Sequence, residues 1–412
     1  MSNTNNNNNN KNDQNLKSSS SSSSVSKSSS IIRNQRWVLK QHPKGKFVAK
    51  RDLKLIEEEI NLDEIQLQPD EFLIQSEVYA VDAFVRTVLD EGNYHGGTRN
   101  PGSNIVANGY GKVIKTGSNQ VYKVGTTVLG VFPVAKIAIC PKNPFVRPMM
   151  PLLPGQTKSS TLSIMGMSGM TAYFGLFHPP NLYGPTQSDT VVISAAAGSV
   201  GCCAIQMAKL SGVKRVVGIA GGKHKKQFLI EELHCDGVVD YKDTTTTSLS
   251  DQLDQTCPDG IDFYFDNVGG EILDVVLTKV NKNARVVICG AMSQYDTGTF
   301  HDAGGVCGPS NYLKLAERHA SMTGFSIMNY LSGPSAIWNM FCFFLFAWWH
   351  HLFIKRNLKE YKHVEHGIEK FGRGIEMLFD GGSSSHIGRL LIDVDGSLST
   401  HNEKQEQGEQ KS

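Results

Sequence analysis

The stretch from Thr190 to Gly201, TVVISAAAGSVG, constrains the fold of this 412-residue chain more than any other. An apolar run ends in three alanines and a glycine-rich turn, and the helical pattern CCAIQMAKL follows. Glycines let a backbone approach a ligand closely, and the unpaired N–H groups of a first helical turn favour an anion. The pattern predicts a strand, a phosphate-binding turn and a helix, with Gly198, Ser199, Val200 and Gly201 at the phosphate.

Further strands and helices alternate downstream of this turn. The strand patterns are RVVGIAG (215–221), GVVDYK (237–242), IDFYFDNVG and ARVVICG (284–290), with helical patterns near 224–234, 248–256 and 270–280. Strands separated by helices of about ten residues form right-handed βαβ units and a parallel sheet. We therefore expect a Rossmann-type, doubly wound α/β domain over residues 161–324.

The chain before residue 160 has a different pattern. Short β-rich runs separated by glycines, among them ANGYGKVIKTGS and YKVGTTVLGVF, lie between Asn104 and Phe132. Close spacing of strands and turns predicts a barrel-like β domain. The proline-rich linker 141–155 excludes a regular helix or a central strand. The strand-like segment 388–394 should return to this β-rich substrate domain, which we assign to residues 31–160 and 325–398.

Composition limits the remaining possibilities. Residues 1–30 are rich in Asn and Ser and predict a disordered tail, and residues 399–412 form a polar tail. The formal net charge of +2 gives no sign of a nucleic-acid partner. The eight cysteines include no C-x-x-C motif, and the first 30 residues lack the apolar core of a signal peptide. We expect a cytoplasmic protein that is a monomer or a homodimer.

The segment 336–354, AIWNMFCFFLFAWWHHLFI, carries no formal charge and precedes Lys355 and Arg356. Its length makes it a candidate for a transmembrane helix. A buried or oligomer-interface helix is the favoured interpretation, because a crossing would leave the later strand 388–394 on the wrong side. Shallow contact with a membrane surface is the remaining alternative.

A basic cluster follows the second strand of the α/β pattern. The strand ends at Gly221 and Gly222, and Lys223, His224, Lys225 and Lys226 come next. Sites for NAD place a carboxylate at this position, whereas sites for NADP place basic groups that pair with the 2′-phosphate. A solvated helix start is the alternative, but positive charge there opposes the helix dipole. The cluster favours NADP(H).

Several sequence motifs, taken together, resemble those of a known enzyme family. AAAGSVG, GGKHKK, VDYK, YFDNVGG and ICGAMSQY occur in this order, with GMSGMTAYFGL (166–176), RWVL, VDAFVR (81–86) and GFSIMNY (324–330) around them. Over about residues 34–395 the chain resembles the zinc-free medium-chain dehydrogenase/reductases, in the branch of prostaglandin reductases and alkenal double-bond reductases. GFSIMNY favours the 15-oxoprostaglandin 13-reductase type. The resemblance implies that the β-rich domain is GroES-like.

The resemblance also implies an activity and a set of site residues. The activity is NADPH-dependent reduction of the C=C bond of α,β-unsaturated ketones or aldehydes, such as 15-oxoprostaglandins or alkenals, by hydride transfer to the β-carbon. The pyrophosphate would lie on Gly198 to Gly201, and the 2′-phosphate on Lys225 and Tyr241. The two riboses and the nicotinamide would be bordered by Asn267, Cys289, Gly290, Ala291, Met292, Ser293, Gln294, Tyr295, Phe325, Ser326, Ile327 and His386, and the substrate by Val131, Phe132 and Met328.

Two of these assignments have structural alternatives. Asn267 could cap the helix that begins near 270, and Cys289 with Gly290 could simply end a buried strand. No metal is expected, because the segment NIVANGYG (104–111) offers neither Cys nor His as a zinc ligand.

The chain also departs from the family at several positions. Phe84 replaces a tyrosine, Met328 replaces a tyrosine that some members carry, and His386 replaces an asparagine. We therefore expect Tyr295 or Tyr330 to supply the catalytic hydroxyl. The alternatives are a quinone oxidoreductase, or a cofactor-binding, membrane-associated protein with little turnover.

Overall fold

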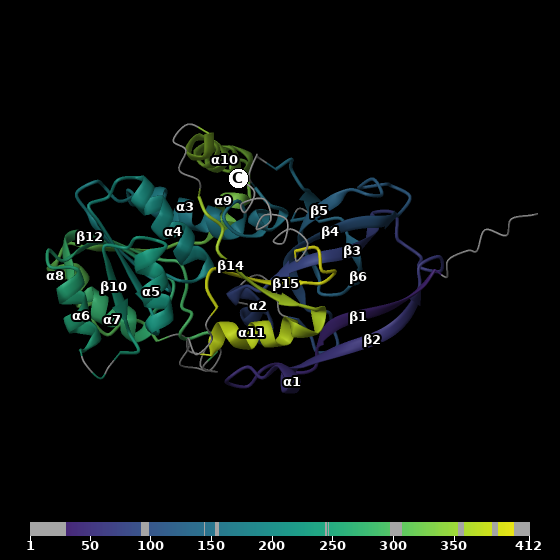
Figure 1. The fold of residues 1–412 in the computed structure, drawn as a ribbon, viewed down its shortest axis with the longest axis horizontal. Coiled ribbons are helices and arrows are strands. Elements are labelled where there is room, and N and C mark those ends of the chain that lie inside the picture. Colours follow the sequence, from purple (N-terminus) through teal and green to yellow (C-terminus); the bar gives the residue numbers. More distant parts are fainter. Residues whose placement is uncertain are drawn as a thin grey trace, which may run out of the picture.

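The computed structural model describes residues 30–91, 99–143, 145–152, 156–243, 245, 247–296, 307–352, 358–380 and 386–398. Two large sheets organise this part of the chain, one parallel and one mostly antiparallel (Figure 1). Of the predicted tails 1–30 and 399–412, all residues except Ser30 lie outside the described residues.

The parallel sheet contains six strands in the described part of the chain, in the order β10-β9-β8-β11-β12-β13. This is the Rossmann order, in which the chain reverses direction across the sheet between β8 and β11. The predicted doubly wound fold is therefore confirmed. The strands are β8 (Thr190–Ser194), β9 (Arg215–Ala220), β10 (Gly237–Asp240), β11 (Ile261–Asp266), β12 (Val280–Ile288) and β13 (Ser321–Gly324).

Helices cover both faces of the parallel sheet. Side chains of β11 alternate between two hydrophobic clusters, with Phe263 and Phe265 in one and Tyr264 in the other, as the two-residue period of a strand requires. All three are fully buried. The helices are α3 (Met167–Phe177), α4 (Ser199–Leu210), α5 (Lys223–Glu231), α6 (Leu249–Thr256), α7 (Gly270–Leu277) and α8 (Leu313–Glu317).

The second sheet follows the order β14-β15-β3-β4-β5-β7, with β6 paired to β3. Its strands are β3 (Glu71–Ala80), β4 (Val106–Thr116), β5 (Thr127–Pro133), β6 (Ile137–Pro141), β7 (Arg147–Pro148), β14 (Lys362–His366) and β15 (Arg389–Asp393). Strand β7 lies at the sheet edge, where a proline costs no ladder hydrogen bond. The predicted β-rich domain is confirmed as a fold class.

A hairpin and several short helices complete this side of the molecule. Strands β1 (Ile31–Leu39) and β2 (Leu53–Asn61) pair with each other in a separate sheet. The short helices are α1 (Ala49–Asp52), α2 (Ala83–Val88) and the 3-10 helices η1 (Lys158–Leu162) and η2 (Ile368–Lys370).

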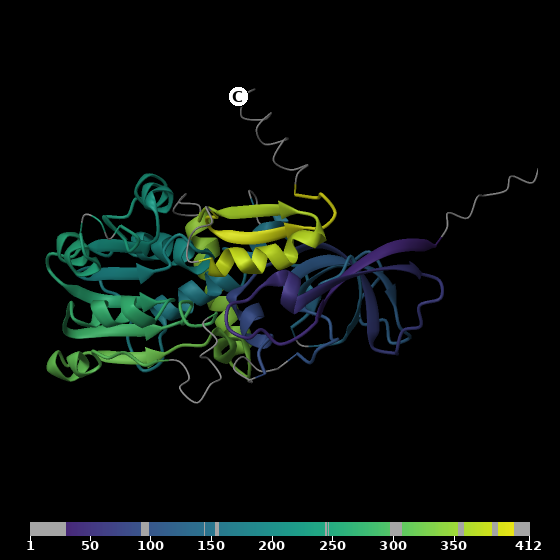
Figure 2. The same cartoon turned by 90° about the horizontal axis from the view of Figure 1, so that it is seen from below.

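The C-terminal segment returns to the antiparallel side, as expected for 388–394. Strand β15 pairs with β3, and α11 (Phe371–Phe379) packs beside it in the middle of the molecule (Figures 1 and 2). A Cβ at Gly372 would lie 3.0 Å from the Cβ of Ala49, and one at Gly374 would lie 3.0 Å from Val81. These glycines let the helix approach its neighbours closely, and they also hide the helical pattern from sequence reading.

The motif GFSIMNY (324–330) has a strand-like sequence, but only its first residue, Gly324, lies in a strand. Strand β13 ends at Gly324, and α9 (Ile327–Leu331) follows. Ile327, Tyr330 and Leu331 pack against the core that contains α3, at the spacing of one helical face. Tertiary packing therefore overrides the β propensity of this run. The proposed boundary at 324/325 stays a prediction, since side chains from 325 to 347 join the core of the parallel sheet.

Helix α10 (Ala336–Leu352) corresponds to the uncharged segment 336–354, of which 353 and 354 lie outside the described residues. Phe343 and Ala347 are buried against the core, whereas Ile337, Trp338 and Phe341 are more than half exposed. Within the described residues, no helix is long and apolar enough to span a membrane.

Candidate active site

The glycine-rich turn joins the end of β8 to the start of α4. Gly198 is the N-cap residue, and no side chain caps the first turn of α4. A Cβ at Gly201 would lie 2.3 Å from the carbonyl oxygen of Ala195, so the helix packs directly on the turn. A Cβ at Gly198 would meet only that oxygen, at 3.1 Å. The surface of the turn at Gly198 is therefore open to a ligand, whereas Gly201 is packed against the backbone of the turn.

The same turn contacts two other parts of the chain. Ser199 Oγ donates a hydrogen bond to Ser168 Oγ at 2.7 Å, which joins the first turns of α4 and α3. Val200 packs on the core, and Gly388 N–H donates to the Ala197 carbonyl at 2.9 Å. The C-terminal segment that precedes β15 is thus held against the turn.

Asn267 lies where β11 ends, beside the end of β8. Its Nδ2 donates to the Ser194 carbonyl at 2.8 Å, and its backbone N–H donates to Ser194 Oγ at the same distance. Asn267 does not cap α7, because the N-cap residue is Gly269 and no side chain caps it. The amide is therefore positioned by the neighbouring strand.

A buried carboxylate holds this strand end. Asp266 accepts hydrogen bonds from Ser194 Oγ at 3.0 Å, the Tyr264 hydroxyl at 2.8 Å and Gly269 N–H at 3.0 Å. Burial raises the pKa of the Asp266 carboxyl, although these donors favour its charged form. Sequence reasoning missed both Asp266 and Ser194. The sequence signal that could have identified Asp266 was an aspartate at the end of an apolar strand, directly before Asn267.

The predicted run 289–295 lies against the same strand end. Backbone N–H groups of Cys289 and Gly290 donate to the Asp266 carbonyl at 2.7 and 3.1 Å, and that of Met292 donates to the Asn267 carbonyl at 3.1 Å. Strand β12 ends at Ile288, so Cys289 and Gly290 follow the strand. The structure therefore brings this run beside Asn267.

The rest of the run closes into a compact turn. Ser293 Oγ donates to the Val268 carbonyl at 2.7 Å, and Ala291 and Gln294 lie next to Gly269. Tyr295 is 6% exposed, and its hydroxyl accepts the Ala291 N–H at 3.0 Å. The Tyr295 hydroxyl thus helps to shape the turn.

A cavity of about 450 Å³ opens at the carboxyl ends of β10 and β11. Tyr241 lines it, with the polar side chains of Ser248, Asp251 and Glu271. A Cβ at Gly221 would lie 2.7 Å from the Tyr241 ring, so glycine permits the ring to cover the end of β9. Ligands of open α/β sheets bind at this edge.

The carboxylate of Asp240, at the end of β10, accepts hydrogen bonds from two backbone N–H groups. Asp240 accepts the Gly222 N–H at 2.7 Å and the Lys242 N–H at 3.1 Å. It thereby fixes the turn that leads into α5. Sequence reasoning did not identify this role.

Lys225 lies close enough to His386 to perturb its imidazole electrostatically, although the two residues are far apart in the sequence. Burial lowers the pKa of Lys225; the charge of Asp380 opposes this shift, and that of Lys242 adds to it. Burial also lowers the pKa of His386 to about 4, with a further contribution from Lys225. The imidazole is neutral at pH 7. Lys225 thus lies near both a second lysine, Lys242, and the carboxylate of Asp380.

The segment 325–330 continues the edge of the parallel sheet. Phe325 N–H donates to the Ile288 carbonyl at 2.9 Å, and its ring is buried. The Tyr330 hydroxyl donates to the His178 carbonyl, and its ring stacks on Phe174 with centroids 4.7 Å apart. Ile327 is half-buried, and Ser326 and Met328 are exposed.

The residues predicted to border the substrate differ in exposure. Phe132 is 1% exposed and packs edge-to-face on Tyr79 inside the antiparallel core. Val131 is half-buried and shares its sheet face with Leu129, two residues earlier on β5. Leu129 lines an apolar cleft of about 360 Å³, together with Met165 and residues of α10. Of the two predicted residues, Val131 therefore points to the side of the sheet where this cleft lies, and Phe132 points to the other side.

Metal ligands are not clustered in the part of the chain that the structure describes. No group of three or more His, Cys, Asp or Glu side chains there could hold a metal ion.

Comparison with known families matches two parts of the chain. Residues 35–147 match the N-terminal domain of oxidoreductases, and residues 199–335 match the zinc-binding dehydrogenases. The second match begins within the glycine-rich turn, at Ser199, and contains the run 289–295.

Individual relatives match longer stretches. The 2-alkenal reductase (NADP(+)-dependent) of Nicotiana tabacum is 32% identical over 305 residues, 73% of this chain and 82% of the relative. Prostaglandin reductase 1 of Oryctolagus cuniculus is 32% identical over 271 residues, 65% of this chain and 71% of the relative. YfmJ of Bacillus subtilis is 43% identical over 172 residues, 42% of this chain and 48% of the relative.

A solved structure supports the same relationship. CurA of Vibrio vulnificus in complex with NADPH superposes with a TM-score of 0.71 at 27% identity, and the match covers 88% of this chain and 99% of CurA. The predicted resemblance is confirmed by these matches. The chain belongs to the zinc-free medium-chain dehydrogenase/reductases, in the branch of prostaglandin and alkenal reductases.

Proposed function

We propose that this protein is an NADP-dependent oxidoreductase that reduces the C=C bond of α,β-unsaturated ketones or aldehydes. The observation that carries the proposal is the Ser199–Ser168 hydrogen bond, which joins the glycine-rich turn to the segment whose Met165 lines the apolar cleft. The turn that we assign to the phosphates is therefore tied to a segment that lines the apolar cleft, which we assign to the substrate. Relatives named as alkenal and prostaglandin reductases support the same activity.

The chain offers a suitable group for each part of NADP(H). The open space beside Gly198 suits the pyrophosphate, and the cavity at Tyr241 suits the adenosine. Lys225 is the residue we assign to the 2′-phosphate, because a phosphate beside it would offset the repulsion from Lys242. Asn267 and the run 289–295 would border the riboses, and the segment 325–327 with His386 the nicotinamide.

Bound NADPH supplies a hydride for the β-carbon of the substrate. The chain's own part is to orient the enone and to exclude water, and the apolar walls formed by Leu129, Met165 and Phe344 serve both purposes. Charge that develops on the carbonyl oxygen needs a hydrogen-bond donor, which we assign to the hydroxyl of Tyr295 or Tyr330. A solvent proton then completes the saturated product at the α-carbon.

The direct test is NADPH consumption by the purified protein with a panel of 15-oxo-eicosanoids, alkenals and quinones. Turnover of the enones and alkenals, with the saturated ketone or aldehyde as the product, is the expected result. Turnover of quinones alone would instead identify a quinone oxidoreductase. Binding of NADPH without turnover of any of these compounds would favour a cofactor-binding protein and contradict the proposal.

A further inference from the structure

The outer face of helix α10 is apolar and exposed to solvent. Ile337 is 83% exposed and Trp338 is 65% exposed, and Phe341 and Leu345 follow them at the spacing of one helical face. On the opposite face, Phe343 is fully buried against the core of the parallel sheet. Contiguous exposed apolar surfaces mark sites of interaction.

Exposed apolar residues of the linker before η1 continue this surface. Met150 and Leu152 line the same cleft as residues of α10, and both are exposed. On the neighbouring strand β7, Arg147 Nη1 donates to the sulfur of Met340 at 3.5 Å, which joins the sheet edge to the helix. We call this surface the α10 face, and it consists of Ile337, Trp338, Phe341, Leu345, Met150 and Leu152.

The α10 face belongs to the basic part of the chain. Residues 92–188 contain eight Lys or Arg residues and no Asp or Glu, and residues 318–359 contain four Lys or Arg residues and again no Asp or Glu. All residues of the α10 face, and all that line the cleft, lie in these two segments. Because the whole chain has a formal net charge of only +2, its positive charge is concentrated in them.

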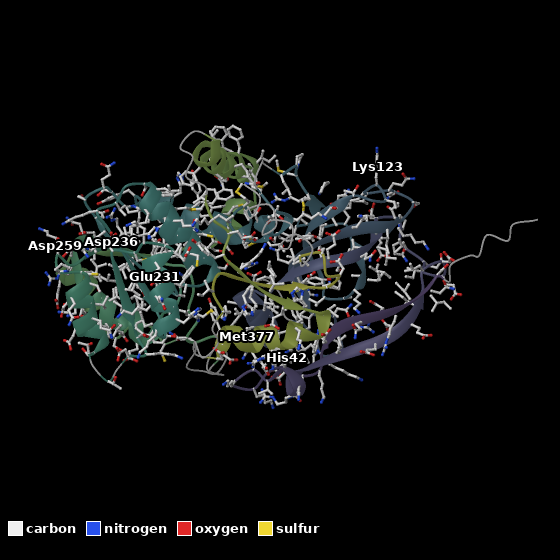
Figure 3. All side chains as sticks on the ribbon, in the orientation of Figure 1. His42, Lys123, Glu231, Asp236, Asp259 and Met377 are labelled. Atoms are coloured by element: carbon white, nitrogen blue, oxygen red, sulfur yellow. The ribbon has the colours of Figure 1, made fainter. Side chains whose placement is uncertain are left out.

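A basic turn lies on the same side of the molecule. The turn between β4 and β5 contains Lys123, which is exposed. The Tyr122 hydroxyl donates to the Val146 carbonyl at 2.6 Å, and this bond holds the turn next to β7. Helix α10 and the Lys123 side chain both lie on the upper side of the molecule (Figures 1 and 3). A flat surface that meets the α10 face is therefore close to this lysine.

Acidic side chains from other parts of the chain contact the two basic segments, but they lie inside the fold or at its border. Glu77 pairs with Lys158 at 2.9 Å, and Glu360 accepts hydrogen bonds from two serine hydroxyls at η1. Both carboxylates are largely buried. Asp70 accepts a hydrogen bond from Asn119 at 2.7 Å, at the border of the antiparallel sheet. The α10 face itself contains no acidic side chain.

We propose that the α10 face docks on the surface of a membrane that contains anionic phospholipid. Tryptophan and other aromatic side chains favour the interface between lipid and water, and basic side chains are attracted to anionic headgroups. A second copy of the chain fits this face less well, because a symmetric contact would bring two basic surfaces together. The contact is shallow, since no helix of the described residues can span a membrane.

Docking would bring the apolar cleft to the lipid. Phe341 and Leu345 are exposed and also line the cleft, so the cleft opens on the α10 face. An apolar compound could then pass between the lipid and the cleft without crossing water. Docking of this kind goes beyond the proposed function and requires neither NADPH nor an enone.

Flotation of the full-length protein with lipid vesicles is the test. Vesicles of phosphatidylcholine with about 30% phosphatidylserine should bind the protein about tenfold or more tightly than vesicles of phosphatidylcholine alone. About 0.5 M NaCl should release most of the bound protein, because salt screens attraction between exposed charges. Equal binding to the two kinds of vesicle at low and high salt, or binding to neither, would overturn the proposal.

Substitutions locate the contact. The double variant Ile337→Ser/Trp338→Ser changes two exposed residues outside the cleft lining and should lower the partition coefficient for the anionic vesicles about tenfold or more. Lys123→Gln should lower it about fivefold. Leu313→Ser, at a 62% exposed residue of α8, and Lys214→Gln, which breaks the exposed pair with Asp259 (Figure 3), are the matched controls and should bind like the wild type.

The Tm and the Kd for NADPH should be the same in all four variants as in the wild type. Unchanged vesicle binding by the double variant at an unchanged Tm would contradict the proposal. Dimers in sedimentation velocity that dissociate in the double variant, without vesicle binding by the wild type, would identify a surface for self-association and also overturn it. Vesicle binding without turnover of any enone would leave the docking intact and contradict only the proposed function.

Discussion

The Asp296 carboxylate accepts a hydrogen bond from Nε of Arg86 at 3.0 Å and another from the backbone N–H of Phe47 at 2.7 Å. Arg86 is 1% exposed and also pairs with Asp90. Asp296 directly follows the turn 289–295, whereas Arg86 belongs to α2 on the antiparallel side. One buried ion pair therefore ties the turn that we assign to the cofactor to the opposite side of the molecule.

Removing one partner of this ion pair should destabilise the protein. Asp296→Ala leaves the buried guanidinium with less compensation, and we expect a loss of about 3 kcal/mol in the free energy of unfolding. Urea denaturation measures this loss, and the Kd for NADPH should rise because the turn loses its anchor. Asp259→Ala, which removes an exposed pair with Lys214 at the outer side of the parallel sheet (Figure 3), is the control and should change neither quantity. Similar effects of the two substitutions would contradict this role of Asp296.

Lys225 should discriminate between the two nicotinamide cofactors. Lys225→Ala removes the cation that we assign to the 2′-phosphate, so the Kd for NADPH should rise about tenfold or more. The Kd for NADH, which lacks this phosphate, should not change. Fluorescence titration of both cofactors measures the difference. Lys223→Ala, at an exposed lysine on the same helical turn, should leave both values unchanged. Equal losses for NADPH and NADH would remove Lys225 from the phosphate site.

The elements around the glycine-rich turn could be predicted because local signals and tertiary packing agree there. The apolar strands, the glycines and the helical periodicity of α4 to α7 all indicate the same βαβ order. In helix α11 the local signals and the packing disagree. Gly372 and Gly374 lower the helix propensity of the segment, but they allow the helix to pack closely on its neighbours. The opposite conflict occurs at residues 327–331, where residues with β propensity form a helix that packs against α3.

The candidate site likewise contains residues that the sequence predicts and residues that it does not. Backbone positions such as Gly198 and the run 289–295 follow from motif order, because their place depends on strand ends. Side chains that act across the fold could not be predicted from spacing alone. Asp296 meets Arg86 over 210 residues of sequence, and Arg147 reaches Met340 over 193. Phe132 carries a motif position but packs inside the core, since strand alternation directs it inward.

His386 should make stability depend on pH. Its pKa is about 4 in the folded protein and near 6.5 when unfolded, so the unfolded chain binds more protons between these values. Stability should therefore fall as the pH drops from about 6.5 to 4, by up to roughly 3 kcal/mol from this residue. Urea denaturation at pH 7.5 and pH 5 measures the slope. His386→Asn should lose less stability over this range than the wild type; an identical loss would show that His386 does not titrate in this way.

Substitution of Tyr295 and Tyr330 tests the reaction most directly. Each hydroxyl already makes a hydrogen bond within the fold, so the test must separate a catalytic role from a structural one. Tyr295 accepts the Ala291 N–H, and Tyr330 donates its proton to the His178 carbonyl. A residue that stabilises charge on the substrate oxygen should lower kcat when its hydroxyl is removed, by about 10²-fold or more for a well-placed donor, at unchanged Kd for NADPH. A purely structural hydroxyl should instead lower stability by about 1–3 kcal/mol, since its removal leaves a backbone group unsatisfied. Tyr295→Phe and Tyr330→Phe, each measured for enone turnover, NADPH binding and urea unfolding, separate these outcomes. We expect at least one of them to lose turnover with NADPH affinity intact. Unchanged turnover in both would exclude these two tyrosines as the donor, and the substrate oxygen would then depend on backbone N–H groups or water.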